Sequence, residues 1–476
     1  MTLAASVRWI AVAQAARFAS QMLSLVVLAR LLPADAYGLM AMAMTVTNFA
    51  FLFRDLGTMA AIIQRPRVPA LLKHSLYWLN LGLALLLALL LAALASPLAH
   101  AYRDPRLAAV LMALALVFPL SALASVQQAL LERESRFRLL ARIETLSALG
   151  GVAVALAAAS HGAGVWSLVW QMLAATGLAS LQLLWASPWR PRWRYSWRAL
   201  RLMLDFSGHF AAFQFLHYLQ RNADSMLIGR LLGPALLGVY AMAFKIVLSP
   251  LQHISWVASR ALVPAMSRCQ HQPERLAELY QRASGMTALL TAPLMAGLYA
   301  LREPFVLLVL GPAWSALVAL VPWLAALGLI QAQAAIPGAV LLAQGQARCM
   351  LRLGLLSALL QLAGFVLALR WGLPGMVAAY CVTSLLSLLP LSGYALAGLP
   401  LRALALLAEI TRPVAAALVM LVAVAALYAR LLGGGAGMAA AFWTCVAAGA
   451  LVYAAILLAM RVPQLDNLWP LRGARP

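Results

Sequence analysis

Charged residues are scarce in this chain, and acidic residues are the scarcest. Only 10% of the 476 residues are charged, with 13 Asp and Glu, whereas 64% are hydrophobic and the mean hydropathy is +0.90. A soluble globular protein carries an apolar share of about 45–50%. The composition therefore excludes that class and predicts an integral membrane protein. Its spans are expected to be α-helical, because lipid offers backbone amides no hydrogen-bond partner.

Cysteines and catalytic motifs are also scarce. There is no CxxC pair, so neither a disulfide framework nor a zinc spacing is indicated, and the free cysteines are expected in the apolar interior: Cys269, Cys349, Cys381 and Cys445. The sequence contains no HExxH, GxxxxGK[ST] or GxSxG motif. Its seven histidines are dispersed without the spacing of metal ligands. These absences favour a transporter over an enzyme, and they predict no cofactor and no metal site.

Apolar runs long enough to cross a bilayer recur along the whole chain. They predict about fourteen transmembrane helices, at residues 7–30, 37–63, 76–98, 107–131, 140–160, 163–185, 203–229, 236–260, 281–301, 315–342, 352–370, 373–397, 412–430 and 438–460. The first run is interrupted by Arg17 and is part of an internal repeat. We therefore expect it to remain as a span rather than to be cleaved as a signal peptide.

Basic residues outnumber acidic ones, 35 to 13, and give a net charge of +22. In a soluble protein this excess would indicate nucleic acid binding. Here the lysines and arginines gather in every second connection between the predicted spans, which is the pattern of the positive-inside rule. The pattern predicts a multi-pass membrane protein with both termini in the cytoplasm and no nucleic acid partner.

Part of the sequence occurs twice. Residues 14–43 and 214–243 align without a gap, and each copy reads as a long apolar helix, a short turn and another apolar helix. The identical positions are Gln14/Gln214, Arg30/Arg230, Leu31/Leu231, Leu32/Leu232, Gly38/Gly238, Ala41/Ala241, Met42/Met242 and Ala43/Ala243. An even number of predicted spans separates the copies, which indicates a parallel repeat about an axis along the membrane normal. Such repeats are typical of transporters with a substrate site between the halves, although an inert relic of duplication is the alternative.

The repeat predicts an all-α architecture of two six-helix bundles related by a pseudo-twofold axis, followed by two C-terminal helices. The expected divisions are an N-terminal bundle, a basic and tryptophan-rich cytoplasmic linker, a second bundle, and two extra helices with a cytoplasmic tail. Their respective limits are 1–185, 186–201, 202–400 and 401–476.

The predicted linker places a tryptophan at every fourth position among arginines: Trp185, Trp189, Trp193 and Trp197. Tryptophan and arginine both favour the headgroup layer of a membrane. The linker is therefore interpreted as an interfacial anchor or, alternatively, as a docking patch for anionic lipid headgroups. Pro188 and Pro191 argue against one continuous helix there.

Each repeat copy has a polar stripe on its first helix. The residues are three or four positions apart and so share one helix face: Gln14, Arg17, Gln21 and Ser24 in the first copy, and Gln214, His217, Arg221 and Asp224 in the second. Charges inside a bilayer normally face a wet cavity or a partner, so the two stripes predict a hydrophilic cleft. The alternative is that these groups hydrogen-bond between helices and only hold them together.

Further ionisable residues fall inside predicted spans. Arg54 and Lys245 would add positive charge to the cavity, and Lys245 makes it asymmetric because Thr45 occupies the matching position. The carboxylates Asp224, Asp55 and Asp205 are candidates for ion coupling. Simpler interpretations are a local ion pair of Asp224 with Arg221, a contact of Asp205 with linker arginines, and snorkelling of Arg54 to the membrane surface.

Four motifs carry a family resemblance: ARLLPADAYGLMAMA at 29–43, DLGTMAAIIQR at 55–65, RNADSMLIGRLLGPALLGVYAMAFK at 221–245 and PAMSR at 264–268. The chain resembles the polysaccharide-transporter (Wzx-like) flippases of the multidrug/oligosaccharidyl-lipid/polysaccharide (MOP) exporter superfamily. The likeness covers the first eight spans. It implies a two-lobed inner-membrane protein that moves an oligosaccharide on undecaprenyl diphosphate to the periplasmic leaflet by alternating access, for exopolysaccharide or O-antigen biosynthesis.

The same resemblance assigns Arg221, Asn222 and Asp224 to a motif that faces the central cavity. It implies membrane lipids, and polymerase and export proteins of the same pathway, as partners. A cationic cavity suits such a substrate, because Arg makes bidentate contacts with phosphate. The alternatives are a cation or drug antiporter of the same superfamily, a flippase for the peptidoglycan lipid precursor, and a membrane enzyme such as a polymerase. The enzyme is disfavoured by the short predicted loops.

Overall fold

The computed structural model describes residues 21–54, 62, 69–197, 218 and 222–460. Within these ranges the regular structure is helical and no strand occurs, which confirms the predicted all-α fold class. Eight helices of the described part are long and apolar enough to cross a membrane, or nine if a bent helix pair forms one span. The total number of spans along the chain stays a prediction.

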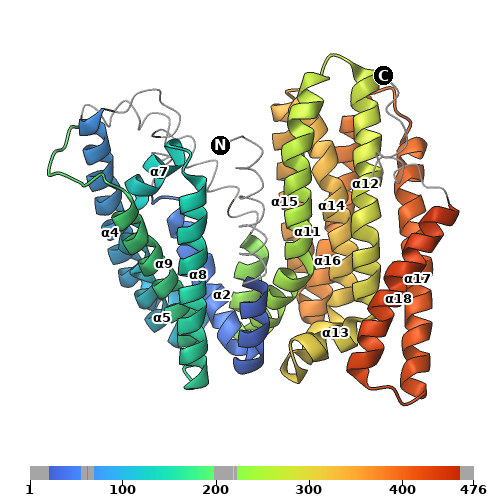
Figure 1. The fold of residues 1–476 in the computed structure, drawn as a ribbon, viewed down its shortest axis with the longest axis horizontal. Helices are drawn as coiled ribbons and strands as arrows, with labels where there is room; N and C mark the ends of the chain where they lie inside the picture. Colours follow the sequence, from blue (N-terminus) through green and yellow to red (C-terminus); the bar gives the residue numbers. More distant parts are fainter. Residues whose placement is uncertain (1–20, 55–61, 63–68, 198–217, 219–221, 461–476) are drawn as a thin grey trace. The chain divides into compact units, whose positions relative to one another are not determined.

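The chain packs as two compact units, Met1–Ala241 and Met242–Pro476. The first unit contains a helix at Gln21–Leu31 and, in chain order, α2 Ala34–Phe51, α4 Ala70–Tyr102, α5 Arg106–Ala115, α6 Val117–Ala122, α7 Ser125–Arg133, α8 Phe137–Ser160 and α9 Val165–Ala186. Helices α8 and α9 pack along each other, as do α4 and α5 (Figure 1). Helix α11, Pro234–Arg268, begins in this unit and continues into the next.

The second unit continues with α12 Pro273–Ala300, α13 Arg302–Val309, η1 Pro312–Ala319, α14 Val321–Ala343, α15 Ala347–Ala368, η2 Leu369–Trp371, α16 Gly372–Ala397, α17 Ala403–Gly433 and α18 Met438–Ala459. Helix α12 packs against both α14 and α17, and α16 packs against α14 and α15. The C-terminal pair α17 and α18 joins α12 through a core that includes Leu289, Met420 and Tyr453. The two extra helices predicted from the sequence are therefore packed elements of this unit.

Outward-facing leucines show how these helices meet lipid. On α4, a candidate membrane span, Leu86 is 60% exposed and Leu89 is 70% exposed. Because transferring such side chains from water to an apolar medium is favourable by about 25 cal/mol per Å², a helix with this much exposed apolar surface is stable only in a membrane. Hydropathy predicts the span, and the exposure of these leucines identifies its lipid-facing side.

One span was predicted at 107–131, but the structure has three helices there, α5, α6 and α7. Its first part, Arg106–Ala122, is bent by 44° against Ser125–Arg133. The break between α5 and α6 is at Leu116, and Pro119 in α6 has no N–H to bond the carbonyl of Ala115, the last residue of α5. Other helices begin earlier than predicted, at Ala70, Pro273 and Ala403, because hydropathy marks only the apolar part of a helix whose polar end extends beyond the bilayer.

Candidate functional site

The structure describes only part of the predicted site. Seven candidate residues lie outside the described ranges: Gln14, Arg17, Asp55, Asp205, Gln214, His217 and Arg221. Gln21, Arg54, Asp224 and Lys245 are described. The first three belong to the first unit and Lys245 belongs to the second. The meeting of the two polar stripes in one cavity therefore stays a prediction.

The described part of the first polar stripe has two different environments. Gln21 is exposed, whereas Ser24, three residues later on the same helix, is buried. Farther along, Leu28 and Leu32 of this helical region pack with Ala155, Ala159 and Leu168 of α8 and α9. The helix thus passes from an open position at Gln21 to a packed one within a single turn.

Arg54 follows the end of α2 and is half-buried. Its guanidinium carbon lies 5.4 Å from the ring centroid of Phe51, within the range of a cation–π contact. The ring of Phe51 in turn packs against Phe118 of α6, with 4.7 Å between the centroids. An aromatic pair that joins α2 to α6 therefore holds this arginine.

Lys245 and Thr45 occupy the same position of the two repeat copies but behave differently. Thr45 is buried, and its hydroxyl donates to the carbonyl of Ala41 at 2.8 Å. Lys245 is exposed on α11, a helix that is apolar around it. An exposed cation on a membrane helix has to meet water, phosphate or another polar group. The two positions therefore differ in exposure as well as in charge: the neutral Thr45 is buried and the cationic Lys245 is exposed.

Asp224 is the buried carboxylate of the second repeat copy. It is 9% exposed, its Oδ1 accepts the backbone N–H of Ser225 at 2.7 Å, and its Oδ2 accepts the hydroxyl of Tyr240. Tyr240 is 2% exposed. The contact joins the helix before the repeat turn to the start of α11. Since Arg221 is outside the described residues, the predicted pair of Asp224 with Arg221 is not described.

Tyr240 was not among the residues predicted from the sequence, although a signal for it was present. The matching positions of the first copy hold Ser24 and Met40, where the second copy holds Asp224 and Tyr240. The carboxylate and its phenolic donor therefore distinguish the second copy together. A comparison of non-identical positions within the repeat would have identified the pair.

The second copy also attaches to α2 through the region of the RN-x-D motif. The amide of Asn222 donates to the carbonyl of Tyr218 at 2.9 Å. The hydroxyl of Tyr218 donates to the carbonyl of Thr45, and its ring lies 5.7 Å from that of Phe49. Asn222 and Asp224 of this motif thus bond to neighbouring helical residues and help to fix how the two copies pack.

The two repeat copies meet where α2 crosses α11. A Cβ on Gly38 would overlap the carbonyl oxygen of Pro234 and lie 2.9 Å from the nitrogen of Gly238. Reciprocally, a Cβ on Gly238 would overlap the carbonyl oxygen of Ala34 and lie 2.9 Å from the nitrogen of Gly38. Each contact is the counterpart of the other in the repeat. This close backbone approach explains why both copies of the repeat have glycine at this position.

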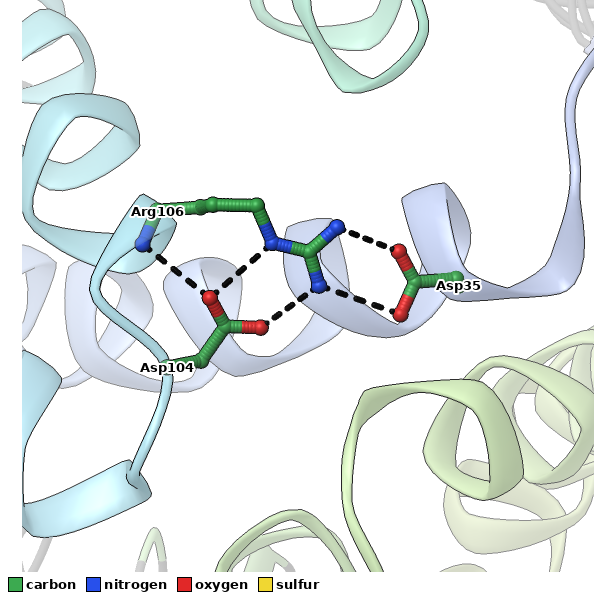
Figure 2. Close-up of polar contacts among 3 residues, drawn as sticks. All are labelled: Asp35, Asp104 and Arg106. Atoms are coloured by element: carbon green, nitrogen blue, oxygen red, sulfur yellow. Dashed lines mark hydrogen bonds and ion pairs between the residues drawn. The ribbon is translucent and has the colours of Figure 1, made fainter.

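An ion-pair network fixes the same end of α2. Figure 2 shows the guanidinium of Arg106 between two carboxylates: Nη1 lies 2.7 Å from Oδ2 of Asp35, and Nη2 lies 2.7 Å from Oδ2 of Asp104. The backbone N–H of Arg106 also donates to Asp104 at 3.0 Å. The hydrogen bond from the Arg106 side chain lowers the pKa of Asp104 below its usual range, against the opposing effect of burial. The network ties the starts of α2 and α5 to the loop after α4.

Metal-binding geometry is absent from the described part of the chain, in which no three His, Cys, Asp or Glu side chains are grouped to hold an ion. The described groups can offer cationic and hydrogen-bonding contacts to a ligand. They comprise an exposed ammonium, a half-buried guanidinium and a buried carboxylate with a phenolic donor.

Comparison with known proteins identifies relatives in polysaccharide biosynthesis. The sequence profile of a family described as polysaccharide biosynthesis protein matches residues 27–319. The succinoglycan biosynthesis transport protein ExoT of Rhizobium meliloti (strain 1021) is 28% identical over 315 residues, which are 66% of this chain and 64% of ExoT. The lipopolysaccharide biosynthesis protein WzxC of Escherichia coli (strain K12) is 24% identical over 341 residues, 71% of this chain and 69% of WzxC. The match to ExoT thus spans slightly less than two thirds of that relative.

Two solved structures share the fold. The inward closed conformation of the lipid II flippase MurJ aligns with a TM-score of 0.77 and 12% identity, over 95% of this chain and 98% of MurJ. An inward-facing multidrug resistance MATE family transporter of the MOP superfamily aligns with a TM-score of 0.63 and 14% identity, over 83% of this chain and 96% of that one. At these identities the likeness shows the fold alone.

The family match covers more than half of the chain and includes most of the first repeat copy, all of the second and the close approach of Gly38 and Gly238. It agrees with the resemblance carried by the motifs at 29–43 and 221–245. The chain therefore belongs to the polysaccharide biosynthesis protein family, the Wzx-like polysaccharide transporters of the MOP exporter superfamily.

Proposed function

We propose that this protein is a flippase that moves a lipid-linked oligosaccharide across the bacterial inner membrane by alternating access. The lipid carrier is undecaprenyl diphosphate, and the product feeds the assembly of an exopolysaccharide or O-antigen. The observation that carries the proposal is the family match across residues 27–319. It is supported by ExoT, whose name describes a biosynthesis transport protein, and by WzxC, which is named for lipopolysaccharide biosynthesis.

The charge distribution suits an anionic diphosphate. Arg17, Arg54, Arg221 and Lys245 all fall in predicted spans, where placing a cation in lipid is costly. A diphosphate headgroup offsets this cost, because charge-assisted hydrogen bonds to phosphate are short and strong. Polar residues of the two stripes, Gln14, Gln21, Gln214 and His217, contribute further donors and acceptors in this proposal. The contacts have to remain moderate in strength, since the substrate must leave on the far side.

The proposed topology follows from the distribution of basic residues. Both termini lie in the cytoplasm, and the oligosaccharide is moved towards the periplasmic leaflet. Asp224 is the leading candidate for ion coupling, with Asp55 and Asp205 as further candidates. The proposed partners are membrane lipids and the polymerase and export proteins of the same pathway. In this proposal the protein transports its substrate without changing it chemically and uses no cofactor.

The function can be tested by complementation and by direct transport. A strain that lacks a related polysaccharide flippase should regain surface polymer when it expresses this chain. Proteoliposomes that contain the purified protein should expose an undecaprenyl diphosphate oligosaccharide to an enzyme added on one side only. The Arg17→Ala and Arg221→Ala variants should lose both activities while they still reach the membrane in normal amounts. Normal export by both variants would remove those residues from the proposed site.

Two results would replace the proposal. Rescue of a strain depleted of its lipid II flippase, without rescue of polymer export, would indicate the peptidoglycan precursor as substrate. Resistance of overexpressing cells to several cationic drugs, again without polymer export, would indicate an antiporter. The shared fold makes both comparisons necessary, because fold alone does not determine the substrate.

A further inference from the structure

The last two residues of α9 and the segment that follows them lie against the start of α4. We call these residues, 185–197, the Trp–Arg segment. Within it, the backbone N–H of Arg192 donates to Nδ1 of His74 at 3.0 Å, and the carbonyl of Arg192 accepts the indole N–H of Trp78 at 3.0 Å. The backbone N–H of Ser196 donates to the hydroxyl of Ser75 at 2.9 Å. Backbone groups of the segment therefore make these contacts.

Aromatic contacts complete the attachment. The ring of Trp189 stacks on His74 with 5.3 Å between centroids, and the ring of Trp193 meets Trp78 edge to face at 4.1 Å. His74 is buried. The Trp–Arg segment is thus a defined structure on the end of α4. Its described contacts with α4 come from its backbone and its aromatic rings, whereas the guanidinium of Arg190 donates to the carbonyls of Ser187 and Trp189 within the segment.

The outer side of the segment combines exposed tryptophan with exposed arginine. Trp193 is 86% exposed, Trp185 is 76% exposed and Trp197 is 55% exposed. The side chains of Arg190, Arg192 and Arg194 are exposed as well. Tryptophan is enriched where a membrane meets water, because its ring is amphipathic. The segment joins one end of α9 to one end of α4, and both are candidate membrane spans, so this surface lies at the membrane boundary.

The local sequence supplies no acidic partner for this charge. No Asp or Glu occurs between Thr145 and Trp197, or between Pro69 and Tyr102 on the helix that carries the segment. Lys73 adds another positive charge beside it. Basic residues near an anionic membrane surface each contribute about 1 kcal/mol to binding. The positive charge, the exposed tryptophans and the position at the membrane boundary therefore all favour anionic lipid as the ligand.

We propose that the Trp–Arg segment binds the headgroups of anionic phospholipids in the leaflet that it contacts. Arg190, Arg192 and Arg194 contact the phosphates, and Trp185, Trp193 and Trp197 lie among the glycerol and upper acyl groups. The segment thereby selects anionic lipid at the membrane boundary of the first unit.

The test uses the full chain in nanodiscs of equal parts phosphatidylcholine and phosphatidylglycerol. Native mass spectrometry of the released protein counts the phosphatidylglycerol molecules that stay bound. In the variant R190Q/R192Q/R194Q, the affinity for retained phosphatidylglycerol should fall by about fivefold for each arginine removed. The variant R190K/R192K/R194K should keep most of this affinity, because it keeps the positive charge. Raising the salt concentration should weaken retention in the unmodified protein.

The matched control is R348Q/R352Q/R402Q, which removes the same charge at three exposed arginines outside the segment. It should retain phosphatidylglycerol like the unmodified protein. An equal loss in both glutamine variants would overturn the proposal in favour of a general effect of net charge. Unchanged retention in R190Q/R192Q/R194Q would overturn it as well, and would leave an interfacial anchor without lipid selection. Size-exclusion chromatography of each variant shows whether it is folded.

Discussion

Gly38 and Gly238 approach each other so closely that a Cβ on either would lie 2.9 Å from the backbone nitrogen of the other. They hold the same position in the two copies of the repeat. The contact is reciprocal, because each added Cβ would also overlap a carbonyl oxygen of the other copy, that of Pro234 or that of Ala34. Two membrane helices without a hydrophobic driving force between them gain stability from close packing, which small residues allow.

Gly38→Ala and Gly238→Ala should each destabilise the protein, because the added methyl group meets backbone atoms that cannot rotate away. Overpacking of this kind costs about 1–3 kcal/mol. The measurement is the melting temperature in detergent, followed by fluorescence-detected size exclusion. Gly82→Ala is the control, since a Cβ at Gly82 of α4 meets no atom within 4 Å and alanine is the better helix former. Equal melting temperatures for Gly38→Ala and Gly82→Ala would contradict the close crossing.

Tyr240→Phe should destabilise the protein by removing the donor to the buried carboxylate of Asp224. Loss of one partner of a buried polar group costs about 1–3 kcal/mol. In a double-mutant cycle, Tyr240→Phe should cost little when Asp224 is already replaced by Leu, because no acceptor for the Tyr240 hydroxyl then remains. Thermal unfolding of the four proteins measures the coupling. The control is Tyr394→Phe, at a tyrosine that is 56% exposed, and strictly additive effects would disprove the interaction.

The sequence was sufficient for the fold class because hydropathy and the positive charge of alternate connections both follow directly from the properties of a bilayer. It also located the Gly38/Gly238 identity, although nothing in the sequence says that two identical residues touch. The contacts of Arg106 with Asp35 and Asp104 were not predicted, because Asp35 is 71 residues away in the sequence and a two-residue spacing such as that of Asp104 and Arg106 does not by itself indicate an ion pair. The tryptophans near 186–201 were predicted to lie at the membrane surface, but their contacts with His74 and Trp78 on α4 were not predicted.

The network around Arg106 should make stability depend on acidic pH. The folded protein holds the pKa of Asp104 below its usual range through the Arg106 hydrogen bond, and the unfolded value is about 3.9. A carboxyl group with a lowered pKa in the folded state stabilises the protein above the unfolded pKa, and this contribution is lost as the pH falls through the folded value. The contribution of Asp104 to the melting temperature should therefore be constant above about pH 5. It should decrease when the pH is lowered below about 4.

Asp104→Asn isolates this contribution. At neutral pH the variant should be less stable than the unmodified protein, and the difference should shrink as the pH is lowered below about 4. Asp35→Asn should have a smaller effect, about 0–1 kcal/mol, because Asp35 and Arg106 are 37% and 56% exposed whereas Asp104 is 8% exposed. The measurement is thermal unfolding across the acidic range. A constant difference between Asp104→Asn and the unmodified protein at every pH would contradict the assigned role.

Replacing Lys245 with Met should separate transport from stability. Because Lys245 is exposed rather than packed, its loss should leave the melting temperature and membrane abundance unchanged. If Lys245 contacts the diphosphate, as proposed, the loss of a hydrogen bond to a charged group should lower the rate of polymer export by about tenfold. Lys245→Arg should keep most of the export, since it keeps the charge.

Arg402→Gln removes an exposed cation just before α17 and serves as the control. Normal export by Lys245→Met would exclude this residue from the substrate path, whereas a fall in both export and abundance would indicate a structural role instead.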